Sequence, residues 1–144
     1  MADDRDLYER FAQPDAWRIF PDVAPTLQGL SGRGLKLGII SNWDDRLRPL
    51  LSALRLDAHF EVIVISCEVG ASKPASAIFE AAIAQLGVPA DSILHVGDSF
   101  EADVQGANSA GLRAVRVDRE SGTFNETHVG SLLDLLRLIE PGGK

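Results

Sequence analysis

The chain has 144 residues, a length that suits one domain with a buried core. Its net charge of -7 and the lack of a Lys/Arg cluster argue against nucleic-acid binding. No apolar stretch approaches the roughly 18 residues that a membrane span needs, and the acidic N-terminus lacks a signal peptide, so we expect a cytoplasmic protein.

The N-terminal segment, residues 1–20, is polar with scattered aromatic residues. It contains no run of three apolar residues, so it does not fit a buried strand. A helix is predicted over residues 21–34, with Asp22 near its N-cap, Pro25 in its first turn and glycines at its exit.

The rest of the chain alternates between short apolar runs and helical patterns. Strands are predicted over residues 35–40, 62–65, 93–96 and 113–117, and helices over residues 44–55, 75–86, 101–110 and 131–139. This alternation predicts a doubly wound α/β domain in which helices cover both faces of a parallel sheet. Cys67, the single cysteine, excludes an internal disulfide, fits a reducing compartment and is expected to be buried.

Two carboxylates follow the third predicted strand. Asp98 stands directly after it and Asp103 falls in the first turn of the next helix. Ligands of open α/β sheets bind outside the carboxyl ends of the strands, and two neighbouring carboxylates repel each other unless a cation lies between them. Mg²⁺ suits such oxygen ligands. The alternative is that Asp98 only caps the helix and Asp103 is a solvated acid.

Polar residues also follow the first two predicted strands. Ser41 and Asn42 precede a helix N-terminus, which favours an anion such as phosphate, although they could form only a capping turn. Lys73 precedes Pro74, which we expect at the first helical position, so the ammonium would be fixed at the helix start unless it is only a solvated charge. A hydroxyl, a cation and an acid pair on three strand ends are what phosphoryl transfer needs.

Three segments in this order resemble motifs of the haloacid dehalogenase (HAD) superfamily. Residues 39–42 are similar to its second motif, Lys73-Pro74 to its third and residues 97–103 to its fourth. The resemblance implies a Rossmann-like, Mg²⁺-dependent phosphatase-type hydrolase acting on a small phosphate ester. Ser41 and Asn42 would hold the phosphoryl group, Lys73 would offset its charge and steady the nucleophile, and Asp98 with Asp103 would hold Mg²⁺.

The family's first motif, an apolar strand ending in Asp-x-Asp that supplies the nucleophile, has no good match. Residues 4–6 have the spacing but no strand ahead of them, so we assign no nucleophile. The resemblance then implies that residues 1–20 are a remnant of the helical cap or a linker, and that residues 21–144 are a core without its central strand. We expect weak Mg²⁺ binding and no activity of the chain alone. The flanking strands would close up, or a second chain would supply the strand, or the chain is a fragment.

Two other functions fit parts of the pattern. A non-catalytic phosphate-binding or protein-interaction module would keep the fold without the chemistry. A receiver domain is also doubly wound, but it needs an acidic pair after its first strand, where this chain has Ser41 and Asn42. His95 lies inside a predicted strand and is expected to be a packed, hydrogen-bonded core residue, and the scattered histidines give no support for a zinc site.

Overall fold

A computed structural model describes residues 19–139 of the chain. The strands are β1 (Gly38–Ser41), β2 (Val62–Ile65), β3 (Leu94–Gly97), β4 (Arg113–Val117) and β5 (His128–Val129). The α-helices are α2 (Val23–Gly32), α3 (Leu47–Ala53), α4 (Ser66–Val69), α5 (Ser76–Leu86), α6 (Gly106–Ser109) and α7 (Asp134–Leu138). Two 3-10 helices, η2 (Asp57–His59) and η3 (Ala90–Ser92), and a π-helix, η4 (Phe100–Gln105), complete the order. The α/β class and the four predicted strands are confirmed.

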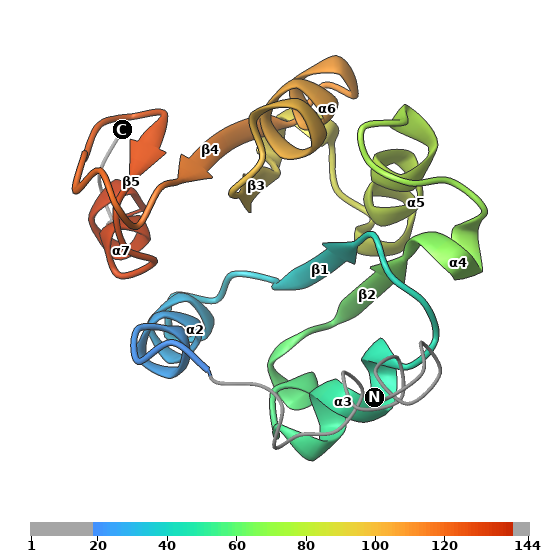
Figure 1. Cartoon of the computed structure of the whole chain (residues 1–144), viewed down its shortest axis with the longest axis horizontal. Helices are drawn as coiled ribbons and strands as arrows, with labels where there is room; N and C mark the ends of the chain where they lie inside the picture. The colour runs from blue at the N-terminus through green and yellow to red at the C-terminus, as the bar shows by residue number, and fades with distance from the viewer. Residues whose placement is uncertain (1–18, 140–144) are drawn as a thin grey trace, which may run out of the picture.

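The strands form two parallel sheets (Figure 1). One contains β1 and β2, with Gly38 opposite Val62. The other has the order β3-β4-β5, with Leu94 opposite Arg113. Among the described residues, β1 and β3 are not hydrogen-bonded to each other, although they lie on the facing sides of the two sheets in Figure 1. The two strands therefore do not close up on each other.

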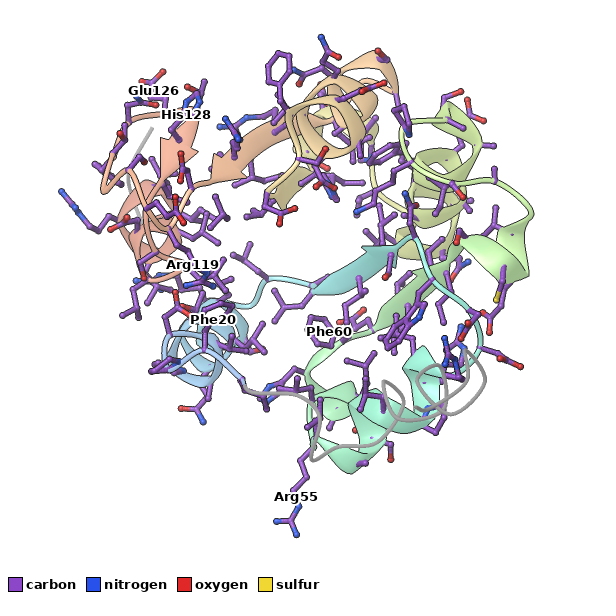
Figure 2. All side chains as sticks on the ribbon, in the orientation of Figure 1. Phe20, Arg55, Phe60, Arg119, Glu126 and His128 are labelled. Atoms are coloured by element: carbon purple, nitrogen blue, oxygen red, sulfur yellow. The ribbon has the colours of Figure 1, made fainter. Side chains whose placement is uncertain are left out.

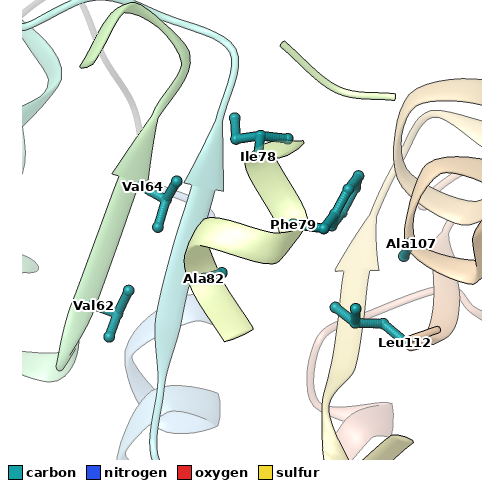
Figure 3. Packing of buried hydrophobic residues seen from close by; sticks show 7 residues of the cluster. All are labelled: Val62, Val64, Ile78, Phe79, Ala82, Ala107 and Leu112. Atoms are coloured by element: carbon teal, nitrogen blue, oxygen red, sulfur yellow. The ribbon is translucent and has the colours of Figure 1, made fainter. Parts of the chain in front are cut away.

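Helix α5 joins the two sheets through the main hydrophobic core (Figure 3). Its Ile78 and Phe79 are completely buried, between Val62 and Val64 on one side and residues from α6 to the start of β4 on the other. Two smaller clusters lie elsewhere: Leu47 and Leu51 of α3 with Ile65 of β2, and Leu135 of α7 with Val115 and Val129 of β4 and β5. Helices thus cover both sheets, as an apolar parallel strand requires.

Local chemistry accounts for most differences from the predicted elements. Helix α3 begins at Leu47, so Pro49 falls in its first turn, where no intrahelical N–H is needed. Asp44, at the start of the predicted helix over residues 44–55, makes no capping bond to α3 and accepts the Arg46 N–H at 3.0 Å. The segment between β2 and the predicted helix over residues 75–86 starts with the single turn of α4, which places Cys67 on the surface. The prediction that Cys67 is buried was therefore wrong, since the buried strand ends at Ile65.

Within residues 19–139, every helix falls short of the length and apolar character that crossing a membrane requires.

Candidate functional site

The residues that follow β1, β2 and β3 meet in one hydrogen-bonded group. Asn42 Nδ2 donates to the Lys73 carbonyl at 3.1 Å, and the Lys73 N–H donates to Asn42 Oδ1 at 2.7 Å. Lys73 Nζ then donates to Asp103 Oδ1 at 2.6 Å. The Lys73 side chain is 14% exposed, so it is an ion-paired group and not the solvated charge of the alternative interpretation. Three of the predicted positions are therefore directly connected.

Lys73 is held by side chains and not by the start of α5. Helix α5 begins at Ser76, two residues after Pro74, and the Lys73-Pro74 peptide bond is cis. The expectation that Pro74 occupies the first helical position was wrong. The two-way contact with Asn42 fixes the Lys73 backbone, and Asp103 fixes its ammonium.

The π-helix η4 directs Asp103 back toward the end of β3. Ser99, and not Asp98, is the N-cap: its Oγ accepts the Ala102 N–H at 3.1 Å, while its own N–H donates to Asp103 Oδ2 at 3.1 Å. This reciprocal pair resembles a capping box. The Asp103 and Val104 N–H groups both donate to the Ser99 carbonyl, which widens the turn. Asp103 therefore faces the sheet and is 4% exposed.

Gly97 is the residue that makes this close approach possible. A Cβ at Gly97 would lie 2.1 Å from Asp103 Cγ, a separation that no side chain tolerates. The last residue of β3 must therefore be glycine if Asp103 is to reach Lys73 in this way.

Asp103 is held in its ionised form by its surroundings. Burial alone raises its pKa, but hydrogen bonds from His95, Lys73 and the Ser99 N–H together bring the pKa well below its usual range. His95 Nε2 lies 2.9 Å from Asp103 Oδ1, and its ring packs edge-on against Phe79 with centroids 5.2 Å apart. The prediction of a packed, hydrogen-bonded His95 is confirmed. Its contact with Asp103 was not predicted, although a histidine inside an apolar strand just before Gly-Asp was the available signal.

Ser41 and Asp98 are next in sequence to Asn42 and Ser99 of this group, but within residues 19–139 neither side chain is hydrogen-bonded to Lys73. Ser41 is the last residue of β1, and Asp98 follows β3 with an exposed side chain. Next to Asp98 is a pocket of about 340 Å³ that Phe20, Arg116 and Arg119 also line. Arg116 Nε donates to the Asp98 carbonyl at 3.1 Å, and the Arg119 guanidinium lies 3.8 Å from the centre of the Phe20 ring (Figure 2).

The acid pair does not form a complete metal site within residues 19–139. No group of three or more His, Cys, Asp or Glu side chains in that part of the chain is placed to hold a metal ion. Both carboxylate oxygens of Asp103 accept hydrogen bonds from protein groups, which leaves Asp98 as the more accessible acid. A Mg²⁺ ion would need at least one further oxygen ligand from the protein or many waters.

Comparison with known proteins gives consistent matches. The chain is 39% identical over 123 residues to haloacid dehalogenase-like hydrolase domain-containing protein 3 of Danio rerio, covering 85% of this chain and 50% of that protein. It is 38% identical over 106 residues to glyceraldehyde 3-phosphate phosphatase of Methanopyrus kandleri, covering 69% of this chain and 43% of that protein. The chain thus spans about half the length of these curated relatives.

A solved structure extends the match to the fold. The crystal structure of a HAD phosphatase from Thermococcus onnurineus superposes with a TM-score of 0.84 at 32% identity, covering 99% of this chain and 66% of that one. The family of haloacid dehalogenase-like hydrolases matches residues 1–111, which is most of the chain. The chain therefore belongs to the haloacid dehalogenase-like hydrolase family.

Proposed function

We propose that this chain supplies the phosphoryl-binding part of a phosphatase-type hydrolase that acts on a small phosphate ester. The observation that carries the proposal is the bonded connection from Asn42 through Lys73 to Asp103 at the carboxyl ends of β1 and β3. This connection fixes the Lys73 ammonium at the carboxyl ends of the strands, where α/β sheets bind ligands. The similarity to a glyceraldehyde 3-phosphate phosphatase supports a phosphate ester as the substrate class.

The hydrogen bonds indicate a different role for each of these side chains. Both polar atoms of the Asn42 side chain are used by the Lys73 backbone, so Asn42 positions Lys73 in place of binding phosphate through its amide. The Lys73 ammonium would offset the charge of the phosphoryl oxygens, and the Ser41 hydroxyl would donate to one of them. The pocket beside Asp98 would hold the organic part of the ester.

We also propose that the hydrolysis depends on Mg²⁺, but a complete metal site would need a further ligand from outside residues 19–139. Asp98 would be a direct ligand, and Asp103 would contribute only after giving up one of its present hydrogen bonds. When bound, Mg²⁺ would neutralise negative charge on the phosphoryl oxygens. Affinity should therefore be weak until another carboxylate completes the set.

The attacking group is also missing from the described residues. Residues 19–139 contain no Asp-x-Asp sequence. Removing a central catalytic group lowers turnover by several orders of magnitude. We therefore propose that the chain alone binds phosphate without turning an ester over.

The test is an assay of the purified chain with p-nitrophenyl phosphate, with and without Mg²⁺ and with and without a separate segment that carries Asp-x-Asp after an apolar run. We expect Mg²⁺-dependent hydrolysis only with the segment, and its loss in Lys73→Met. Lys36→Met is the matched control, since Lys36 is exposed at the opposite end of β1 and donates to the Leu86 carbonyl at 3.3 Å. Phosphate binding without hydrolysis in every combination would favour a non-catalytic module.

A further inference from the structure

Arg116 brings unused hydrogen-bond donors to the pocket beside Asp98. Arg116, Arg119 and Phe20 line this pocket of about 340 Å³ together with Asp98. Arg116 is half-buried, and within residues 19–139 its side chain makes one hydrogen bond, from Nε to the Asp98 carbonyl at 3.1 Å. Both of its Nη groups are therefore without a protein partner in that part of the chain. Because Arg116 borders the pocket, these donors are available to a ligand there.

The other arginine of the pocket is already engaged. Arg119 Nη1 donates to Asp22 Oδ2 at 2.8 Å, and the guanidinium lies 3.8 Å from the centre of the Phe20 ring (Figure 2). Arg119 therefore holds Phe20 in place as an apolar wall of the pocket. Phe20 is 55% exposed, which leaves ring surface for the carbon atoms of a ligand.

Three carboxylates also border the pocket and limit what Arg116 can bind. They belong to Asp98, the proposed metal ligand, to Asp118 and to Glu120. Asp118 Oδ1 accepts the Glu120 N–H at 3.2 Å, and Glu120 is exposed. These acids oppose a long-range attraction of anions, so an anion at Arg116 has to be held by short contacts. A carboxylate meets that need, because its two oxygens match two N–H groups of one guanidinium.

One peptide group connects Arg116 to the phosphoryl-binding residues. The peptide between Asp98 and Ser99 accepts from Arg116 Nε at its carbonyl and donates from its N–H to Asp103 Oδ2, each at 3.1 Å. Because the oxygen and nitrogen of a peptide group are about 2 Å apart, Arg116 Nε lies within about 9 Å of Asp103 Oδ2. Asp103 Oδ1 in turn accepts from Lys73 Nζ at 2.6 Å. A phosphate ester with a short carbon chain can therefore reach both cations.

We propose that the ester carries a carboxylate, which the Arg116 guanidinium binds through both Nη groups while Lys73 holds the phosphoryl group. The carboxylate site rests on the proposed function, since it holds the far end of the same ligand. The substrate class is then a three-carbon phosphorylated hydroxy acid, with its carbon chain against Phe20. Arg116 is the residue that distinguishes such an acid from a neutral polyol phosphate.

The test compares two three-carbon esters that differ only at the end opposite the phosphate. That end is a carboxylate in 3-phosphoglycerate and a CH₂OH group in glycerol 3-phosphate. Binding of each ester to the full 144-residue chain is measured by isothermal titration calorimetry at about 0.15 M salt, without Mg²⁺. We expect 3-phosphoglycerate to bind about tenfold more tightly, because it gains charge-assisted hydrogen bonds.

Three variants assign this preference to Arg116. In Arg116→Met the ratio of the two Kd values should fall to about one, because the carboxylate loses its partner. Arg116→Lys should give an intermediate ratio, since an ammonium keeps the charge without the fork, and it carries the test if Arg116→Met does not fold. The matched control is Arg113→Met, at the exposed first residue of β4. It removes the same charge and should keep the wild-type ratio.

The outcomes separate the carboxylate site from the proposed function. Equal Kd values for the two esters, or a preference that survives in both Arg116 variants, would overturn the carboxylate site alone. If the preference depends on Arg116 but 3-phosphoglycerate is not hydrolysed when the Asp-x-Asp segment is added, the carboxylate site stands and the proposed hydrolysis fails. If neither ester binds, or if Lys73→Met binds both as tightly as wild type, both proposals fail.

Discussion

Gly97 shows how one residue without a side chain determines the chemistry of the site. A Cβ there would lie 2.1 Å from Asp103 Cγ. In Gly97→Ala, Asp103 has to move and its contacts with Lys73 and His95 break, so we expect the free energy of unfolding to fall by about 1–3 kcal/mol. Gly32→Ala is the control, since nothing lies within 4 Å of its Cβ position, and its stability should stay within about 1 kcal/mol of wild type. Urea denaturation measures both, and equal stabilities would contradict the argument.

At the scale of single residues, the sequence predicted which side chains gather but not how they bond. Lys73, Asn42 and Asp103 are each visible as polar residues after a strand, which is enough to expect them at one margin. Their pairing depends on two features without a local signal: the loop that brings Lys73 back to Asn42, and the π-helical turn that aims Asp103 inward. The metal role of Asp98 and Asp103 therefore stays a prediction.

Among the elements, α2 is tied to the C-terminal part of the chain through Asp22. Its Oδ2 accepts hydrogen bonds from Arg119 Nη1 at 2.8 Å, Ser131 Oγ at 2.9 Å and the Leu132 N–H at 2.8 Å. The side chain was expected to cap α2, but it makes no capping bond. Asp22 instead connects elements more than 90 residues apart, which no local pattern reveals.

This connection predicts a pH dependence of stability. Burial raises the pKa of Asp22, but the hydrogen bonds from Arg119, Leu132 and Ser131 lower it overall. A lowered folded-state pKa adds stability that is present above the unfolded value of about 3.9 and is lost as the pH falls below it. Asp22→Asn should lose about 1–3 kcal/mol at pH 7 and show a shallower decline of stability below about pH 4. The control Asp91→Asn, at an exposed residue, should follow the wild-type curve; parallel curves for Asp22→Asn and wild type would refute the assignment.

The predicted elements succeeded where burial dominates. The strands that became β2 and β4 have the predicted bounds, because a short apolar run has few other ways to be buried. The predicted helix over residues 131–139 is only five residues long in the structure, and β5 has only two residues. Both elements are too short for their hydrophobic pattern to predict where they begin and end. The division into two sheets was not visible either, since pairing partners are distant in sequence.

At the scale of the whole molecule, Phe79 of α5 connects the two sheets by packing between them. Its side chain is completely buried, packs in the same cluster as Val64 and contacts His95 of β3. Phe79→Ala should lower the free energy of unfolding by about 3–5 kcal/mol, because it opens a cavity between the sheets. Phe100→Ala removes a ring that is 54% exposed and should change stability by less than about 0.5 kcal/mol. Thermal unfolding of both variants gives the comparison, and a small effect at Phe79 would mean that the sheets are held together elsewhere.

The pairing of the strands also predicts how the backbone of the isolated chain exchanges its amide hydrogens. β4 is hydrogen-bonded on both sides, to β3 and to β5, so its amides should exchange slowest. Among residues 19–139, β1 and β3 are bonded on one side only, so protected and unprotected amides should alternate along each of them, because successive N–H groups point to opposite sides. Uniform protection along β1 or β3 in dilute, monomeric protein would show that the facing edge already has a partner. Alternation in both strands would show that neither facing edge has a partner in the monomer.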